Sequence, residues 1–157
     1  MIQRKQTIYL FFSGLITLVL LFIPFGNLMV ENTPCFEYNA FFVKTLQEEI
    51  VIMSTIGNTI LLIITSTLSF ITVFFFKKRK LQLRLISLNM LVVLITIFTI
   101  SYIYPNFVFN RNVNLIETKL DFNYMIIFIF FSPIGLYVAK KAIAKDEAMV
   151  KNADRLR

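Results

Sequence analysis

The sequence has few of the residues on which most catalytic and metal sites depend. It contains no histidine and no tryptophan, and Cys35 is its only cysteine. Without histidine, zinc, haem and acid–base sites lose their commonest ligand or proton carrier. A lone cysteine forms neither an internal disulfide nor a Cys-x-x-Cys redox pair. We therefore expect no enzyme activity, no cofactor and no metal.

Charge is also scarce, and it is confined to short blocks. Charged residues make up 16% of the chain, against about 25% in soluble domains. Uncharged gaps of 25, 27, 26 and 18 residues lie between Lys5 and Glu31, Glu49 and Lys77, Arg84 and Arg111, and Asp121 and Lys140. A helix needs about 20 apolar residues to cross a bilayer. The gaps predict four transmembrane helices, over approximately residues 7–28, 50–75, 85–104 and 122–142.

The predicted fold class is an all-α membrane protein, a single domain over residues 1–157 that forms a four-transmembrane-helix bundle. The residues outside the spans, about 70, are too few for a separate soluble domain.

The first apolar run is longer than a signal-peptide core, so we expect it to be retained. The tail over 143–157 is rich in helix formers and should extend the fourth helix beyond the membrane. We expect the first outer loop to lie along the lipid headgroups or fold over the bundle, and the second to form a short hairpin or lie on the membrane surface.

Basic residues predict the orientation. Of the 16 lysines and arginines, 13 lie in the N-terminus, the connection between the second and third spans, or the tail. The positive-inside rule places these segments, and hence both termini, in the cytoplasm. The same rule accounts for the net charge of +7, so we expect membrane lipids rather than nucleic acid as partners.

Two groups of residues are candidate contact sites. Ser54, Asn58 and Thr65 in the second span and Asn89 in the third are expected to pack between helices, or alternatively to line a solute path. On the cytoplasmic side, the candidates for contact with a protein partner or anionic lipid are Lys77, Lys78, Arg79, Lys80, Arg84, Met149, Arg155 and Arg157. Pro133 is expected to kink the fourth span.

Three segments carry a resemblance to a known family. They are the opening Met-Ile-Gln-Arg-x-Gln-Thr-x-Tyr-Leu of residues 1–10, the linker Arg-Lys-Leu-Gln-Leu-Arg-Leu of 79–85, and the ending of residues 145–157. Their order and spacing resemble an uncharacterised family of small four-span membrane proteins from Bacteroidetes, a domain of unknown function. The resemblance implies an inner-membrane location and no activity.

These observations favour one function and leave a second open. The first is an accessory or scaffold subunit of a membrane complex, which binds an unidentified protein partner through its cytoplasmic face. The alternative is a small transporter or channel for a neutral solute or lipid, lined by the polar residues of the second span. Whether the chain forms a homo-oligomer stays open, because no Gly-x-x-x-Gly motif is present.

Overall fold

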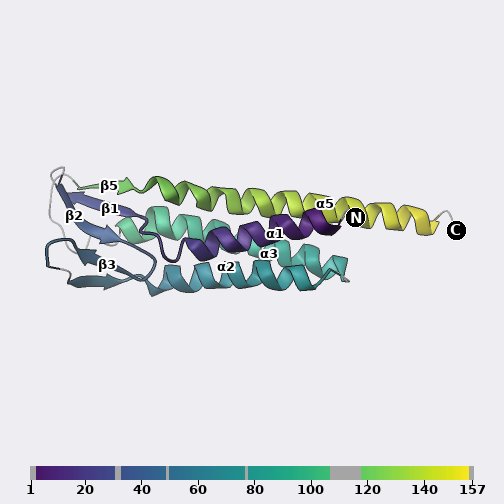
Figure 1. The fold of residues 1–157 in the computed structure, drawn as a ribbon, viewed down its shortest axis with the longest axis horizontal. Coiled ribbons are helices and arrows are strands. Elements are labelled where there is room, and N and C mark those ends of the chain that lie inside the picture. The colour runs from purple at the N-terminus through teal and green to yellow at the C-terminus, as the bar shows by residue number, and fades with distance from the viewer. Residues whose placement is uncertain (1–2, 31–32, 49, 77, 107–117, 156–157) are drawn as a thin grey trace.

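A computed structural model describes residues 3–30, 33–48, 50–76, 78–106 and 118–155. Within these residues, four long helices lie side by side along one axis, and a β-sheet covers one end of them (Figure 1). The first helix begins, and the last helix ends, toward the end opposite the sheet. We refer to these two ends as the sheet end and the terminal end.

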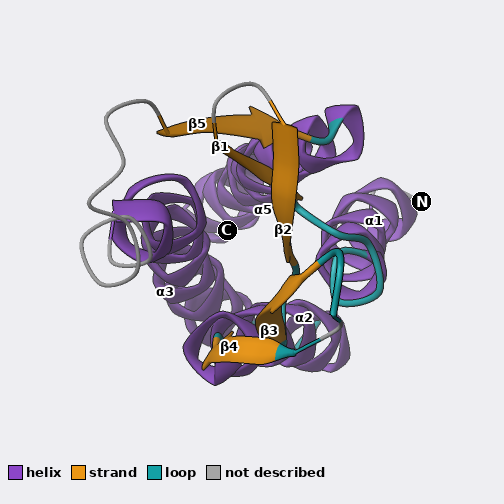
Figure 2. Cartoon of the chain, turned by 90° about the vertical axis from the view of Figure 1, so that its left-hand side faces the viewer, coloured by secondary structure: helices purple, strands orange, loops and turns teal. Residues whose placement is uncertain are grey.

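The helices form a closed ring. They are α1 (Gln3–Val19), α2 (Ile56–Phe74), α3 (Arg79–Phe98) and α5 (Phe131–Arg155). α1 packs against α2 and α5, and α3 packs against the same two helices from the other side (Figure 2). α3 continues into a π-helical turn, η1 (Thr99–Ile103), and α5 is preceded by a 3₁₀ helix, η2 (Tyr124–Phe130).

Three helical segments are long and apolar enough to cross a membrane by length and composition. They are Ile56–Phe74, Arg79–Asn106 and Tyr124–Val150. The apolar part of α1, Gln6–Val19, is shorter, at about 20 Å against a hydrocarbon core of about 30 Å. The described part of the chain therefore indicates a membrane protein with three candidate spans, where the sequence predicted four.

The predicted all-α fold class is wrong, because a five-stranded antiparallel sheet closes the sheet end. Its strands are β1 (Gly26–Val30), β2 (Thr33–Tyr38), β3 (Phe42–Thr45), β4 (Val51–Ser54) and β5 (Thr118–Phe122), in the order β4-β3-β2-β1-β5. β1 lies between β2 and the edge strand β5, and its Asn27 pairs with Glu37 of β2 on one side and Asp121 of β5 on the other. The sheet thus ties the two connecting segments of the chain together.

The strands take up the ends of three of the predicted spans. Residues 26–28 of the first predicted span lie in β1, residues 51–54 of the second lie in β4, and Phe122 of the fourth ends β5. The third helix begins at Arg79, six residues before the predicted span. A short apolar strand that continues directly from an apolar helix cannot be separated from it by hydropathy alone.

Pro133 marks a change of helix type. It lies just after the point at which the 3₁₀ helix η2 becomes the α-helix α5. A proline has no N–H to donate to the carbonyl four residues earlier, and its ring crowds that carbonyl. Pro133 therefore lies in the first turn of α5, which begins at Phe131, and the residues before it keep the tighter 3₁₀ geometry.

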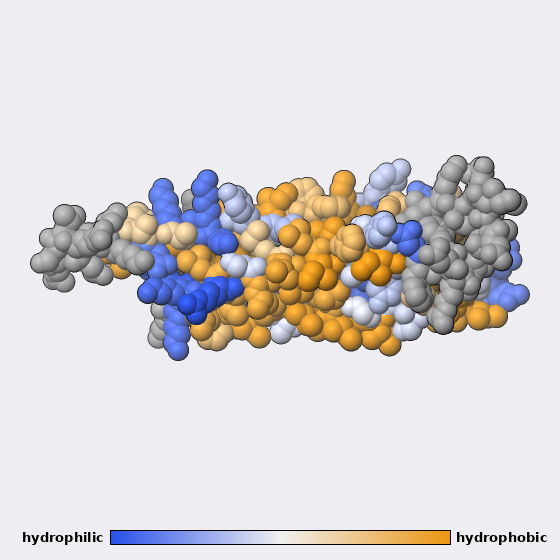
Figure 3. Space-filling model, turned by 180° about the vertical axis from the view of Figure 1, so that it is seen from behind, coloured by the Kyte–Doolittle hydropathy of each residue, from blue (hydrophilic) through white to orange (hydrophobic). Residues whose placement is uncertain are grey.

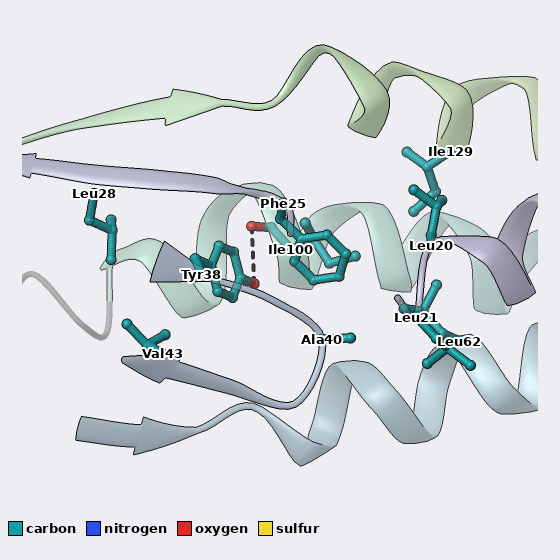
Figure 4. Close-up of a cluster of buried hydrophobic side chains, with 10 residues drawn as sticks. All are labelled: Leu20, Leu21, Phe25, Leu28, Tyr38, Ala40, Val43, Leu62, Ile100 and Ile129. Atoms are coloured by element: carbon teal, nitrogen blue, oxygen red, sulfur yellow. Dashed lines mark hydrogen bonds between the residues drawn. The ribbon is translucent and has the colours of Figure 1, made fainter. Parts of the chain in front are cut away.

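The core divides into two clusters. The larger cluster lies under the sheet and joins residues just after α1 with residues of the strands, α2, η1 and η2 (Figure 4). Within it the rings of Phe25 and Tyr38 pack edge to face with centroids 5.1 Å apart. The second cluster fills the ring of helices toward the terminal end and comprises Leu10, Ile86, Val93, Leu136, Ala139 and Ile143.

The outer surface of the helices is largely apolar. Many large hydrophobic side chains point outward, among them Phe12 of α1, Phe74 of α2 and Leu94 of α3. On the face in Figure 3 they form a hydrophobic belt around the middle of the molecule, with hydrophilic residues gathered toward both ends. This distribution suits a bilayer, because exposing so large an apolar surface to water would be unfavourable.

Candidate functional site

The buried polar side chains form a seam that runs through the ring of helices from one end to the other. At the sheet end, Asn58 of α2 donates from Nδ2 to the Tyr38 hydroxyl at 2.7 Å, and Tyr38 donates to the Ile100 carbonyl at 3.4 Å. The dashed line in Figure 4 marks the second bond. Tyr38 thereby joins the sheet to two helices. Burial raises the pKa of its hydroxyl well above the ordinary value, and the bond from Asn58 offsets only part of that effect.

The sequence around η1 explains why the Ile100 carbonyl accepts from Tyr38. In the π-helical turn, the N–H of Tyr104 bonds to the carbonyl of Thr99. The following residue is Pro105, which has no N–H to offer. The Tyr104 N–H is thus taken by Thr99 and Pro105 has none, so neither residue donates to the Ile100 carbonyl. A buried carbonyl without a hydrogen-bond partner is costly. The Tyr38 hydroxyl supplies the donor.

In the middle of the seam, serines join α1 to its neighbours. The Ser13 and Ser132 hydroxyls lie 2.7 Å apart across the α1–α5 contact. Ser66 of α2 donates to the Gly14 carbonyl of α1 at 3.1 Å. A β-carbon on Gly14 would lie only 3.0 Å from the β-carbon of Ser69, so glycine permits this close approach of the two helices.

Further along, Asn89 of α3 donates from Nδ2 to the Ser69 hydroxyl of α2 at 2.7 Å. Asn58 and Asn89 are both fully buried. Among the described residues, neither the Oδ1 atom of Asn58 nor that of Asn89 has a hydrogen-bond partner. These two amide oxygens are the least satisfied polar atoms of the seam.

At the terminal end the seam contains a buried acid. Asp146 of α5 is 8% exposed and accepts a hydrogen bond from Gln6 of α1 at 2.5 Å. Arg79, at the start of α3, donates to the backbone carbonyl of the same residue at 3.5 Å. Asp146 thus joins three helices at the level where the ring ends. Beyond it α5 continues alone, with Met149 and Val150 exposed.

Several hydroxyls in the seam bond to their own helix. Thr17 donates to the carbonyls of Ser13 and Gly14, and Thr65 donates to that of Leu62. Thr72 and Thr96 bond in the same way, to the carbonyls four residues earlier. Such bonds satisfy a hydroxyl in an apolar environment without a partner on another helix. They leave the seam closed by protein groups along most of its length.

The structure brings together only some of the polar residues predicted from the sequence. Asn58 and Asn89 donate to Tyr38 and Ser69 as described above, whereas Thr65 is buried but bonds within α2. Ser54 lies outside the helix, at the exposed end of β4. Asn58 and Asn89 therefore donate side-chain hydrogen bonds to other elements, whereas Thr65 is buried with its bond inside α2 and Ser54 pairs with Phe42 of β3.

The predicted cytoplasmic contact residues lie at the terminal end. Lys78, Lys80 and Arg84 are exposed at the start of α3, and Arg79 is partly buried by its contact with α5. Met149 is 46% exposed on the projecting part of α5. Lys77 and Arg157 lie outside the described residues, as does the side chain of Arg155.

Sequence reasoning missed the residues that connect distant elements. Tyr38 and Asp146 gave no signal because neither lies in a motif, and their partners are 20 or more positions away along the chain. Ser13 and Ser132 carried a weak signal, as small polar residues within uncharged runs. Among the described residues there is no group of three or more acidic, histidine or cysteine side chains that could hold a metal ion.

Comparison with known families decides what the chain is related to. The profile of the family described as "Domain of unknown function (DUF4293)" matches residues 2–156. The chain belongs to this family. The resemblance to an uncharacterised family noted from the three sequence segments is thereby confirmed. Comparisons with curated proteins and with solved structures gave no significant match.

Proposed function

We propose that this member of the DUF4293 family is a non-enzymatic accessory or scaffold subunit of an assembly in the inner membrane. The observation that carries the proposal is the contrast between a closed interior and an accessible terminal end. Inside, most polar groups of the seam bond to one another or to their own helix. Outside, Lys78, Lys80 and Arg84 are exposed, and the end of α5 projects beyond the other helices (Figure 1).

The proposed topology has four crossings with both termini in the cytoplasm. α1 is the fourth crossing, because it packs along α2 and α5 and so lies at the same depth. It also turns Ile8, Phe11 and Phe12 outward, and these side chains need lipid around them. The mostly apolar residues 20–25 after α1, which form a turn rather than helix, continue the uncharged stretch toward the sheet. The basic residues near the terminal end favour a cytoplasmic position for that end.

Partner contact is proposed at the terminal end. α5 extends nine residues beyond Asp146, or about 13 Å of helix. It carries the exposed pair Met149 and Val150, about one turn beyond Asp146, whose carbonyl accepts from Arg79 at the basic start of α3. An apolar pair on a projecting helix with basic residues beside it suits a partner that offers an apolar groove with an acidic rim. The same basic residues suit anionic lipid headgroups.

The topology is tested with a reporter fused after Arg157 in the full chain. An enzyme reporter that works only in the cytoplasm should be active, and one that works only in the periplasm should be inactive. The opposite result would refute the proposed orientation and, with it, a cytoplasmic partner.

Partner binding is tested by crosslinking from a photoreactive residue placed at position 149. The matched control is the same residue at Tyr124, which is exposed at the sheet end. We expect one protein to be crosslinked from position 149 and not from position 124, and to copurify at a fixed ratio. A Lys78→Glu, Lys80→Glu double variant should reduce that ratio several-fold. Recovery of the protein alone from several mild detergents would contradict the proposal.

A second candidate function is a path for a small neutral solute along α2. It is favoured by the two buried amide oxygens of Asn58 and Asn89 that have no partner among the described residues, since such atoms suit a passing hydrogen-bond donor. Flux into proteoliposomes should then fall with Asn58→Leu, and Ser54→Ala, outside the seam, is the control. Equal flux in both variants would remove this candidate.

A further inference from the structure

The sheet end carries an amphipathic groove that the partner proposal does not use. An apolar cavity of about 280 Å³ lies between the end of α3 with η1 on one side and η2 on the other. Its walls include Ile97, Ile100, Ile127 and Phe130, and its surface is almost wholly apolar. Next to it, a second cavity of about 260 Å³ lies between the start of β1 and the end of β5. This second cavity is about half polar.

The two cavities share a wall. Phe122, Asn123 and Tyr124 line both of them, at the point where β5 ends and η2 begins. The apolar cavity therefore runs along the helices, and the polar cavity lies at the edge of the sheet. We call the two together the η2 groove.

The backbone of η2 explains why the groove exists. A 3₁₀ helix is narrower than an α-helix, and η2 turns most of its large side chains outward. Of its seven residues only Ile129 is buried, while Ile127, Phe128 and Phe130 are about half exposed. The neighbouring turn η1 is π-helical, and such turns widen a helix locally. A narrow helix beside an irregular one leaves space between them.

The groove is apolar at one end and polar at the other, as a phospholipid molecule is. The apolar cavity lies between two segments that are apolar enough to cross a membrane, Arg79–Asn106 and Tyr124–Val150. In a bilayer, a lipid acyl chain can occupy such a cavity. The polar cavity offers Asn27, Asn123 and Asp121 at the depth of the headgroups. Among the described residues that line it, Asp121 is the only one that carries a charge. A carboxylate attracts an ammonium group and repels an anionic headgroup.

We propose that the η2 groove binds one phospholipid with a primary amine in its headgroup. One acyl chain lies between η1 and η2, and the ammonium group lies beside the carboxylate of Asp121. The proposal rests only on insertion of the helices in a membrane and not on the partner at the terminal end. A failure of one proposal therefore leaves the other untouched.

The test is native mass spectrometry of the full chain in a mild detergent, titrated with dioleoyl phosphatidylethanolamine or dioleoyl phosphatidylglycerol. We expect one tightly bound phosphatidylethanolamine per chain and weaker binding of phosphatidylglycerol. Asp121→Asn should weaken binding of phosphatidylethanolamine about tenfold, the effect of losing one charge-assisted contact. It should leave the affinity for phosphatidylglycerol unchanged or higher.

A matched pair of variants locates the acyl chain. Ile127→Trp fills the groove and should weaken binding of phosphatidylethanolamine. Leu15→Trp also adds a bulky side chain to an apolar surface, but beside the other face of η2, and should leave that affinity unchanged. A melting curve by circular dichroism checks that each variant is folded, and Ile127→Phe replaces Ile127→Trp if it is not. Equal affinity for the two lipids, no effect of Asp121→Asn, or equal effects of the two tryptophans would overturn the proposal.

Discussion

Replacing Tyr38 by phenylalanine tests whether the sheet and the helices form one cooperative unit. The tyrosine hydroxyl accepts from Asn58 at 2.7 Å and donates to the Ile100 carbonyl at 3.4 Å. Tyr38 is 1% exposed and Asn58 is fully buried. Tyr38→Phe removes both bonds while it keeps the ring that packs against Phe25. The Tyr38 hydroxyl thus bonds to both α2 and η1, while Thr59 of α2 separately donates to the Ala40 carbonyl at 2.6 Å.

The expected loss of stability follows from the groups left behind. Removing the hydroxyl leaves the Asn58 amide donor buried without a partner, which costs about 1–3 kcal/mol. The bond to Ile100 is long, so it adds little. We therefore expect Tyr38→Phe to lower the free energy of unfolding by about 2 kcal/mol.

The measurement is reversible unfolding in mixed micelles, followed by circular dichroism as the fraction of denaturing detergent rises. Asn58→Leu and the double variant complete a double-mutant cycle. Without the Asn58 amide, Tyr38→Phe orphans no donor, so its cost should fall below about 1 kcal/mol. A change under about 0.5 kcal/mol for Tyr38→Phe alone, or strictly additive costs in the double variant, would refute this reasoning.

Three further predictions use the same assay. Gly14→Ala should destabilise by about 1–3 kcal/mol, because its β-carbon would lie 3.0 Å from that of Ser69; Gly135→Ala, whose nearest neighbour would be at 3.5 Å, should be neutral or stabilising, and the reverse ranking would contradict the helix packing. Asn89→Leu removes a bond worth about 0.6 kcal/mol and leaves the buried Ser69 hydroxyl without that donor, but it also removes an amide oxygen that has no partner among the described residues; because these effects oppose each other, we expect stability to change by less than about 1 kcal/mol, and a larger loss would contradict this balance. The pKa of Tyr38 is raised in the folded state, so its contribution is complete below about pH 10 and is lost as the pH rises above that value. Tyr38→Phe should therefore lose less stability than the parent between about pH 9 and 11, and parallel curves would argue against a buried neutral hydroxyl.

The candidate sites could be predicted from the sequence only where the signal is local. The basic start of α3 and the helical tail followed from charge and helix propensity. Asn58 and Asn89 were identified because an amide inside an apolar run needs a partner. Ser54 was included because it shares their helical spacing, but the chain is extended there and places it on β4. Asp146 was missed because a charge in a basic tail normally faces water, and only the position of Gln6 across the ring shows that it does not.

The amino-acid sequence by itself determined that this protein has long apolar helices, because uncharged runs of that length are stable only in a bilayer or a core. It also determined the family. Only the tertiary structure decided where each run stops being helical. The apolar residues of β1 become a strand because two other strands supply hydrogen-bond partners on both sides: β2, which follows soon after in the chain, and β5, which is about 90 residues away. Hydropathy measures the preference of a side chain for an apolar environment, whereas a strand is specified by its neighbours, and these are known only once the chain has folded.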